Sequence, residues 1–480
     1  MVRREVVLNY VGKIIVIIGL AMLLNVIWAL VYKETTVWQL LIASFITISL
    51  GGGLTKTYHH NQSLNYRESF AVVTLGWVAA SLVGTLPFLL TGHIPSFADA
   101  LFETVSGFTT TGASVLADVE AMPYSLLFWR SLTHWLGGMG IIVLFISVIG
   151  GMGYGANQLF KAEITGPVSD KISPRIKETA RFLWITYVVL TIVLIILLLA
   201  AGMGFFDAVC HGFSTVATGG FSTKNQSIAY WDSGAIQWII ILFMFLCGAS
   251  FALHYQVYSK RTLKQYLVNR EFRMYSLLII IATAIVILGL NLGNGIEHKV
   301  REAVFQVVSV ITTTGFSTID YDQWAPMGKG ILWLLMLVGG CAGSTAGGIK
   351  VIRHLISLQR VGIELKHMLH PRAMISQKFG DKFLDEALVT NVLQFIFLYV
   401  FIAGLGTLVM TALGLDLLSS LSASIACLGN VGPGFAAVGP AVNYGFIPDI
   451  GKYVLCLLML LGRLEIYTFI LVFIPDYWRE

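Results

Sequence analysis

The chain has 480 residues, of which 56% are hydrophobic and only 12% are charged, and its mean hydropathy is +0.79. Soluble globular proteins carry about 25% charged residues, so the composition excludes a soluble protein and predicts an integral membrane protein. The formal net charge of +5 follows from Lys and Arg in loops on one side of the membrane. It therefore requires no nucleic-acid partner.

Ten apolar runs are long enough to cross a hydrocarbon core of roughly 30 Å, which takes about 17–25 helical residues. In chain order they cover residues 14–32, 36–54, 70–90, 126–150, 182–201, 236–257, 275–292, 331–356, 388–413 and 453–474. Four other apolar segments are about half this length, and we expect them to re-enter the membrane rather than cross it.

Each of these short segments ends in a polar turn that contains glycine. Backbone that leaves a helix at membrane depth is tolerated only where it lines a cavity or an ion path. Four such turns predict a ring of carbonyl oxygens that replaces the hydration shell of a cation. The turns are Thr109-Thr110-Thr111-Gly112, Thr218-Gly219-Gly220-Phe221, Thr312-Thr313-Thr314-Gly315-Phe316 and Gly429-Asn430-Val431-Gly432-Pro433-Gly434.

The short segments align as an internal repeat without gaps. An acidic residue opens each of the first three, a serine follows seven residues later, and a glycine six after that. We expect short helices that start outside, with their negative dipole ends pointing at a cation. The aligned positions are Asp99, Asp207 and Glu302; Ser106, Ser214 and Ser309; Gly112, Gly220 and Gly315; the diverged fourth copy has Ser419, Ala426 and Gly432.

The sequence thus predicts an all-α polytopic membrane protein. Four span–pore-helix–filter–span repeats surround one central pore with pseudo-fourfold symmetry, and two additional transmembrane helices precede them. The expected divisions are residues 1–66 for the N-terminal pair, 67–165, 166–262 and 263–372 for repeats 1 to 3, and 373–480 for repeat 4.

Lys and Arg residues are unevenly divided between the two sides of the predicted spans. Both termini and the loops richest in Lys and Arg are expected in the cytoplasm, so the four turns are entered from outside. The basic rim is also suited to anionic lipid. The opposite side holds only Lys33, Lys224, Lys299, Arg301, Lys329 and Lys452.

Three further motifs, together with the four turns, carry a family resemblance over the whole length. They are Trp135-Leu136-Gly137-Gly138-Met139-Gly140, the stretch from Gly339 to Lys350, and Gly462-Arg463-Leu464-Glu465. With them the chain resembles the TrkH branch of the Trk/Ktr/HKT superfamily of potassium uptake proteins. The two helices that precede repeat 1 fit this branch better than the shorter Ktr type.

The resemblance implies a potassium filter. In the family, glycine at all four aligned positions goes with potassium preference and serine in the first repeat with sodium. All four are glycine here, although sodium co-permeation stays open. The expected filter carbonyls belong to Thr110, Thr111, Gly112, Thr218, Gly219, Gly220, Thr313, Thr314, Gly315, Asn430, Val431 and Gly432.

The glycine-rich stretch should break the span over residues 331–356, because each glycine costs about 1 kcal/mol relative to alanine inside a helix. It is not a phosphate-binding loop, which needs Gly-Lys-Ser/Thr after a strand. It resembles the family's intramembrane gate loop, and a close-packed small-residue interface is the alternative. The expected gate residues are Gly339, Gly340, Gly343, Ser344, Thr345, Gly347, Gly348 and Lys350.

Arg463 lies about halfway along the last predicted span, where an arginine faces a partner or an aqueous cavity. In the family, an arginine in this motif sits under the filter near the gate loop, so we assign Arg463 to the gate as an electrostatic barrier. A structural salt bridge is the alternative. Glu465, two residues on, falls on a different helix face.

These features predict potassium uptake through a gated, channel-like pore in the plasma (inner) membrane of a prokaryote. The alternatives are a Na+- or H+-coupled symporter and a pore that also passes sodium. No enzyme and no organic cofactor is expected, K+ being the transported ion. The resemblance also implies a homodimer that docks cytosolic nucleotide-binding TrkA-type subunits, for which the basic segments 171–181 and 260–273 are candidates.

Overall fold

The computed structural model describes residues 2–58, 64–140, 176–289, 295–373, 375–379 and 382–479. These residues are mainly helical, which confirms the predicted all-α polytopic class. Outside the helices lies a hairpin of two short strands, β1 (Lys378–Phe379) and β2 (Lys382–Phe383).

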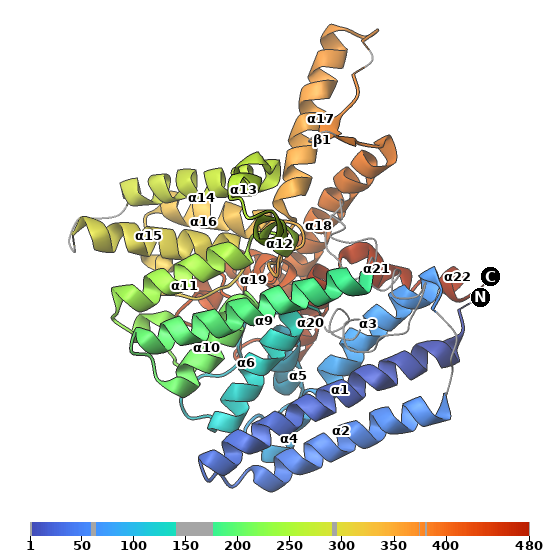
Figure 1. The fold of residues 1–480 in the computed structure, drawn as a ribbon, viewed down its shortest axis with the longest axis vertical. Helices are drawn as coiled ribbons and strands as arrows, with labels where there is room; N and C mark the ends of the chain where they lie inside the picture. Colours follow the sequence, from blue (N-terminus) through green and yellow to red (C-terminus); the bar gives the residue numbers. More distant parts are fainter. Residues whose placement is uncertain are drawn as a thin grey trace.

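Among the residues that the structure describes, six helical stretches are long and apolar enough to cross a membrane. Figure 1 shows α1 and α2 side by side along one flank of the molecule, where they form the expected N-terminal pair. The six are α1 (Arg4–Val31), α2 (Val37–Thr57), α3 (Tyr66–Val83) with α4 (Leu86–Thr91), α9 (Ile176–Ala200), α14 (Arg270–Gly289) and α18 (Glu386–Ala412).

The four short apolar segments form helices of 12, 12, 16 and 12 residues: α5 (Phe97–Phe108), α10 (Phe205–Val216), α15 (Ile296–Ile311) and α19 (Leu417–Leu428). Ser96 and Asp416 cap two of them by accepting backbone N–H bonds. The expectation that Glu302 opens the third was wrong. Charged residues Glu297 and Arg301 continue that helix outward, so it begins at Ile296.

A second helix in each repeat stops after 13 to 15 residues. These are α6 (Tyr124–Gly138), α11 (Gly234–Cys247), α16 (Pro326–Val338) and α20 (Asp449–Arg463). The chain continues in α12 (Phe251–Lys260), bent by 93° from α11, in α17 (Val351–Leu369) after α16, and in α21 (Ile466–Leu471) after α20.

The break predicted at the glycine-rich stretch is therefore confirmed, because residues 339–350 are not helical. The unbroken spans expected over 236–257 and 453–474 were wrong. Neighbouring segments bind the backbone at both breaks: Gly248 O accepts from Cys341 N (2.9 Å) and Met459 O from the Asn430 amide (2.9 Å). Of the expected span over 126–150, residues 141–150 lie outside the described part of the chain.

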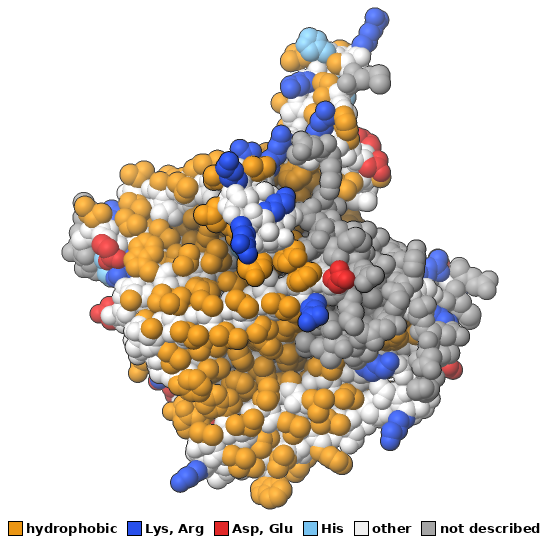
Figure 2. Space-filling view, in the orientation of Figure 1, with side chains coloured by type: hydrophobic (Ala, Val, Ile, Leu, Met, Phe, Trp, Pro, Cys, Tyr) orange, Lys and Arg blue, Asp and Glu red, His pale blue; other side chains and the backbone are white. Residues whose placement is uncertain are grey.

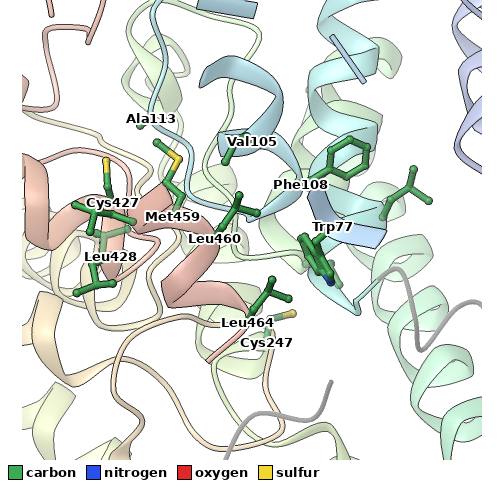
Figure 3. Close-up of a cluster of buried hydrophobic side chains, with 14 of the residues drawn as sticks. Trp77, Val105, Phe108, Ala113, Cys247, Cys427, Leu428, Met459, Leu460 and Leu464 are labelled. Carbon is green, nitrogen blue, oxygen red and sulfur yellow. The ribbon is translucent and has the colours of Figure 1, made fainter. Parts of the chain in front are cut away.

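The core lies where the second helices meet the short helices. Figure 3 shows Met459 and Leu460 of α20 between Val105 and Phe108 of α5 on one side and Cys427 and Leu428 of α19 on the other. Burial of such apolar side chains contributes about 25 cal/mol per Å² in water, but in lipid close packing takes over this role. Helix α20 thus packs between α5 of repeat 1 and α19 of its own repeat, repeat 4.

The remaining elements are short. They are α13 (Lys264–Val268), α22 (Pro475–Trp478) and the 3-10 turns η1 (Ser227–Tyr230), η2 (Tyr321–Gln323) and η3 (Ala436–Val438). The chain termini lie next to each other (Figure 1), where Arg3 Nε contacts Glu68 Oε1 at 2.7 Å and Arg67 donates to the carbonyl of Arg479. Helix α17 projects from the body together with the hairpin (Figure 1).

The surface carries a wide apolar face. Figure 2 shows hydrophobic side chains covering the helices in the centre of the view, and Lys and Arg side chains gathered around α12, α13 and α17. Trp38, Phe45, Leu288 and Phe397 are among the exposed apolar residues. Such a face suits lipid tails, and the basic border suits the headgroup region.

Candidate functional site

The four filter turns have the same backbone conformation. Each turn contains a three-residue filter segment, 110–112, 218–220, 313–315 or 430–432. The first residue of this segment has a left-handed φ of 52° to 56°, although it is Thr110, Thr218, Thr313 or Asn430 rather than glycine. The third residue has a φ of 78° to 93° and is Gly112, Gly220, Gly315 or Gly432. A β-branched residue with positive φ is a strained outlier, so three threonines in this state mark the turns as structurally constrained.

The hydrogen bonds of the turns are also the same. The N–H of the first residue of each filter segment donates to the carbonyl three residues earlier, and the N–H of the second residue donates to the carbonyl five residues earlier. This is the pattern at the C-terminus of a helix that ends in a Schellman motif. The second set is Thr111 N to Ser106 O (2.9 Å), Gly219 N to Ser214 O (2.8 Å), Thr314 N to Ser309 O (2.8 Å) and Val431 N to Ala426 O (2.8 Å). The aligned serine position is therefore a backbone acceptor, which explains why alanine serves in the fourth copy.

The turns close into a ring, in chain order. A Cβ added to any of the four third-position glycines would collide with a carbonyl oxygen of the next turn, so only glycine fits this approach. The distances from that Cβ are 2.1 Å from Gly112 to Gly219 O, 2.0 Å from Gly220 to Thr314 O, 2.3 Å from Gly315 to Val431 O and 2.4 Å from Gly432 to Thr111 O.

Side chains brace the point where repeats 4 and 1 meet. The Asn430 amide donates to Thr111 Oγ1 at 3.0 Å, and the Tyr444 hydroxyl donates to the carbonyl of Gly432 at 2.8 Å. Asn430, Thr111 and Tyr444 are buried. The twelve expected filter residues thus lie together, four turns around one axis, as pseudo-fourfold symmetry requires.

The glycine-rich stretch, residues 339–350, lies against the first residues of filter turns 2 and 3. The Thr345 hydroxyl accepts from Thr218 Oγ1 (3.2 Å), and the N–H of Gly347 donates to Thr313 Oγ1 (2.6 Å). A Cβ at Gly347 would lie 2.3 Å from the carbonyl of Gly429 at the end of α19. This loop therefore touches repeats 2, 3 and 4 at once.

Left-handed backbone shapes the loop at Gly339, Gly343 and Gly348, with φ of 74°, 72° and 75°, and at Lys350, with φ of 80°. The buried Lys350 ammonium donates to the carbonyl of Ala346 within the loop. Gly340 and Ser344 lie in the same segment, where the carbonyl of Gly340 accepts from Val351 N. All eight expected loop residues are thus found in one folded turn.

Arg463 is the last residue of α20 rather than a mid-helix residue. Its guanidinium donates to the carbonyls of Thr345 (2.9 Å), Gly137 (2.6 Å) and Gly138 (2.7 Å). A fourth bond of 3.3 Å reaches Thr110 Oγ1. The cation therefore lies between the first filter turn and residues 339–350, bound to backbone carbonyls.

Glu465 pairs with Arg353 of α17, which also stacks on Phe395 at 3.9 Å. This ion pair links α17 to the segment that follows the break in the last helix.

Sequence reasoning missed two charged sites. Glu271 of α14 accepts from Ala342 N (2.7 Å) and Ile352 N (3.2 Å), at the two ends of the loop. Arg130 of α6 binds Glu103 of α5, with 2.7 Å between Nε and Oε1. A charged residue inside or at the edge of an apolar run was the available signal, and Arg130 lies inside the run 126–150.

Comparison with known proteins agrees with this geometry. A family model described as TrkH, cation transport protein, matches residues 38–480. The Trk system potassium uptake protein TrkH of Salmonella typhimurium is 38% identical over 477 residues, covering 98% of each chain. TrkG of Escherichia coli is 36% identical over 482 residues, covering 99% of each.

The fold has a counterpart among solved structures. The crystal structure of the potassium transporter TrkH from Vibrio parahaemolyticus matches with a TM-score of 0.89 at 34% sequence identity. The match covers 99% of this chain and all of that one.

Proposed function

Because this chain belongs to the TrkH family of cation transport proteins, we propose that it takes up K+ across a prokaryotic plasma (inner) membrane through a gated, channel-like pore. The family is one of transporters, not enzymes. The observation that carries the proposal is the cyclic contact of Gly112, Gly220, Gly315 and Gly432 with the carbonyls of the next turn. Such a ring presents oxygens from four sides to one axis.

In this proposal the filter consists of residues 110–112, 218–220, 313–315 and 430–432, whose carbonyls replace part of the hydration shell of K+. The short helices α5, α10, α15 and α19 end at these turns, and their negative dipole ends favour a cation there. The strained threonines are consistent with backbone held in place by its surroundings.

The proposed gate is the loop 339–350 together with Arg463. Its contacts with Thr218, Thr313 and Gly429 support a place directly beneath the filter. The charge of Arg463 would repel a cation in the path, since Coulomb energy grows as the local dielectric falls. Opening then requires the loop to leave its partners in repeats 2, 3 and 4.

A Na+- or H+-coupled symporter is the principal alternative, and a pore that also passes Na+ is another. A coupled carrier usually keeps an intramembrane carboxylate for the coupling ion. The carboxylates found among these helices are each bound by the protein itself: Glu465 pairs with Arg353, Glu103 pairs with Arg130, and Glu271 accepts from two backbone N–H groups. These contacts favour the pore.

The organisation and partners of the protein are part of the same proposal. The five segments 1–66, 67–165, 166–262, 263–372 and 373–480 would be the N-terminal pair and four pore repeats, with both termini cytoplasmic. The relatives are named for a Trk system, which supports a multi-component transporter. We propose a homodimer with membrane lipid at its basic rim, and TrkA-type nucleotide-binding subunits docked on residues 260–273 and 171–181, of which 171–175 lie outside the described residues.

Reversal potentials in planar bilayers, with K+ on one side and Na+ on the other, test the function. Purified protein should give currents that exceed carrier turnover and reverse far from zero, at a potential whose sign opposes K+ flow out of the K+ compartment. Currents that vanish without Na+ or a proton gradient would establish the coupled alternative. A reversal potential near zero would establish a pore that does not discriminate.

A further inference from the structure

A second ring of contacts lies two residues beyond the filter glycines. At each of these positions the backbone carbonyl accepts a hydrogen bond from the preceding repeat. The acceptors and donors are Ser114 O from Tyr444 N (2.8 Å), Ser222 O from Arg130 Nη1 (3.1 Å), Ser317 O from Ile228 N (3.1 Å) and Gly434 O from the Tyr321 hydroxyl (3.1 Å). Three donors are neutral, and the donor between repeats 1 and 2 is a guanidinium.

The segments that follow the filter glycines are also hydrogen-bonded by side chains of the short helices α5, α10, α15 and α19. Corresponding or adjacent positions of the four helices carry Glu103, His211, Gln306 and Ser422. Each of these side chains forms a hydrogen bond within its own repeat, to a residue two or three positions past the filter glycine. The contacts are Glu103 with Ser114 and Val115 N, His211 with Ser222 Oγ, Gln306 with Thr318 Oγ1 and Ser422 with Phe435 N.

Repeat 1 differs from the others because Arg130, which donates to the next repeat, and Glu103, the side chain on its short helix, are both charged and bind each other. Arg130 places Nε on Glu103 Oε1 (2.7 Å), Nη1 on the carbonyl of Ser222 (3.1 Å) and Nη2 on Ser114 Oγ (3.3 Å). Its guanidinium also stacks on Phe221, 4.1 Å from the ring centre. The planar guanidinium of Arg130 thus links the segments that follow filter turns 1 and 2.

Burial makes this link rigid. Arg130 is 2% exposed and Glu103 is 1% exposed. A buried pair of opposite charges tolerates little displacement, because separation would leave each charge in a medium of low dielectric. The fork geometry of arginine also fixes the orientation of its partners, which a lysine ammonium does not.

We propose that the Arg130–Glu103 pair is a positioning element for ion specificity, which sets the spacing of filter turns 1 and 2 and thereby the preference for K+ over Na+. The inference rests on the proposed function, because it assigns selectivity to those turns. Neither residue supplies a filter carbonyl. Both act through Ser114, Val115 and Ser222.

The matched control is a second ion pair on the same short helix, α5, in which the lysine is buried and the aspartate is partly exposed. Lys452 Nζ lies 2.5 Å from Asp99 Oδ1 and joins α20 to the first turn of α5. Lys452 is 4% exposed. Like the first pair it joins a short helix to a second helix, but among the described residues it makes no hydrogen bond to the segments that follow the filter glycines, so its loss should affect stability and not selectivity.

The experiment measures reversal potential between K+ and Na+ in bilayers, and melting temperature, for wild type, Arg130→Lys, Glu103→Gln and Lys452→Gln. We expect both pair variants to lose about tenfold in permeability ratio, a shift of about 59 mV for a monovalent ion. Lys452→Gln should lower the melting temperature and keep the wild-type reversal potential.

Wild-type reversal potentials in folded Arg130→Lys and Glu103→Gln would overturn the inference, as would an equal shift in Lys452→Gln. If the pair variants do not fold, Ser114→Ala removes only a hydroxyl that both residues contact, and it must shift the potential in the same direction. A wild-type protein that carries no K+ current would instead refute the proposed function, and the inference with it.

Discussion

At the scale of single residues, the filter glycines do two things that no other residue can do together. They hold a φ near 80° to 90°, and they leave room for a carbonyl of the neighbouring turn within 2.4 Å of where a Cβ would stand. A side chain there costs about 1–2 kcal/mol for the left-handed backbone alone. The collision then has to be relieved by moving the neighbouring turn outward.

We therefore expect Gly112→Ser, Gly220→Ser, Gly315→Ser and Gly432→Ser each to reduce selectivity for K+ over Na+. The added Cβ pushes a carbonyl of the next turn away from the axis, which weakens coordination on two sides of the ring. Reversal potentials of the four variants measure the effect. Gly92→Ser is a control, because its φ is also positive but no atom lies within 4 Å of its added Cβ. Unchanged selectivity in all four filter variants would contradict the ring.

Arg463 is the other residue whose contacts set a clear expectation. Arg463→Ala removes a positive charge beside the first filter turn and should increase rubidium uptake per folded protein, most strongly at low K+. It also leaves the carbonyls of Gly137, Gly138 and Thr345 without this donor. The carbonyl of Gly137 keeps its bond from Gly140 N, and each acceptor that is left without a donor costs about 1–3 kcal/mol. A moderate fall in melting temperature should therefore accompany the gain.

Arg463→Lys keeps the charge and serves as the control for the barrier. It should transport near the wild-type rate even where its melting temperature falls, because a single ammonium cannot reproduce the fork of bonds. Lower uptake in Arg463→Ala together with a large loss of stability would show that the residue acts mainly as a structural cross-link.

At the scale of elements, the shared feature is that the second helix of every repeat ends after 13 to 15 residues. Repeat 3 carries the longest interruption that the described residues show, from Gly339 to Lys350. Glu271 holds both ends of this loop through Ala342 N and Ile352 N. The loop is therefore anchored to α14 as well as to the filter, and its release depends on both sets of contacts.

Glu271→Ala should raise ion flux without changing which ions pass. The change removes the acceptor for two loop N–H groups, which shifts the loop away from its position against Thr218 and Thr313. Rubidium and sodium fluxes in proteoliposomes measure it. Glu297→Ala, an exposed site at the outer end of α15, provides the control. Flux at or below the wild-type level in folded Glu271→Ala would argue that the residue only stabilises α14.

Deletion of residues 343–347 should raise flux further, since it removes the part of the loop that carries Thr345 and Gly347. Selectivity should again stay at the wild-type value, because the filter turns keep their ring contacts. A deletion variant that reaches the membrane but conducts no better than wild type would favour a packing role for the glycines.

The sequence predicted a helix break only where residues within the segment itself disfavour a helix. The five glycines between Gly339 and Gly348 disfavour helix on their own, so that break was predictable. The breaks after Cys247 and Arg463 lie within continuous apolar runs and depend on partners far along the chain, such as Cys341 N at Gly248 O. Likewise, the Arg130–Glu103 contact joins two elements 27 residues apart, and hydropathy contains no information about such a pairing.

At the scale of the whole molecule, the termini lie together and the basic residues gather toward α12, α13 and α17 (Figures 1 and 2). By the positive-inside rule we expect these parts in the cytoplasm and the N-terminal end of α15 on the opposite side. The five native cysteines are all buried, so introduced cysteines can be labelled selectively.

Lys264→Cys should react with a membrane-impermeant maleimide only in inside-out vesicles, and Glu297→Cys only in right-side-out vesicles. Both side chains are exposed. Background labelling of the five buried native cysteines is measured on the wild-type chain in both orientations. Labelling of both positions from one side would refute the orientation.

The closed ring also has a consequence for biosynthesis. Thr111 meets Asn430 across 319 positions of sequence, so the turn made first at the ribosome obtains its last neighbour only when the final quarter of the chain has been inserted. Contacts between such distant segments form late. With the pore proposed above, we expect the first three turns to form an incomplete ring until repeat 4, which carries both the fourth turn and Arg463, has been inserted. The positive charge proposed as a barrier is then present as soon as the ring closes.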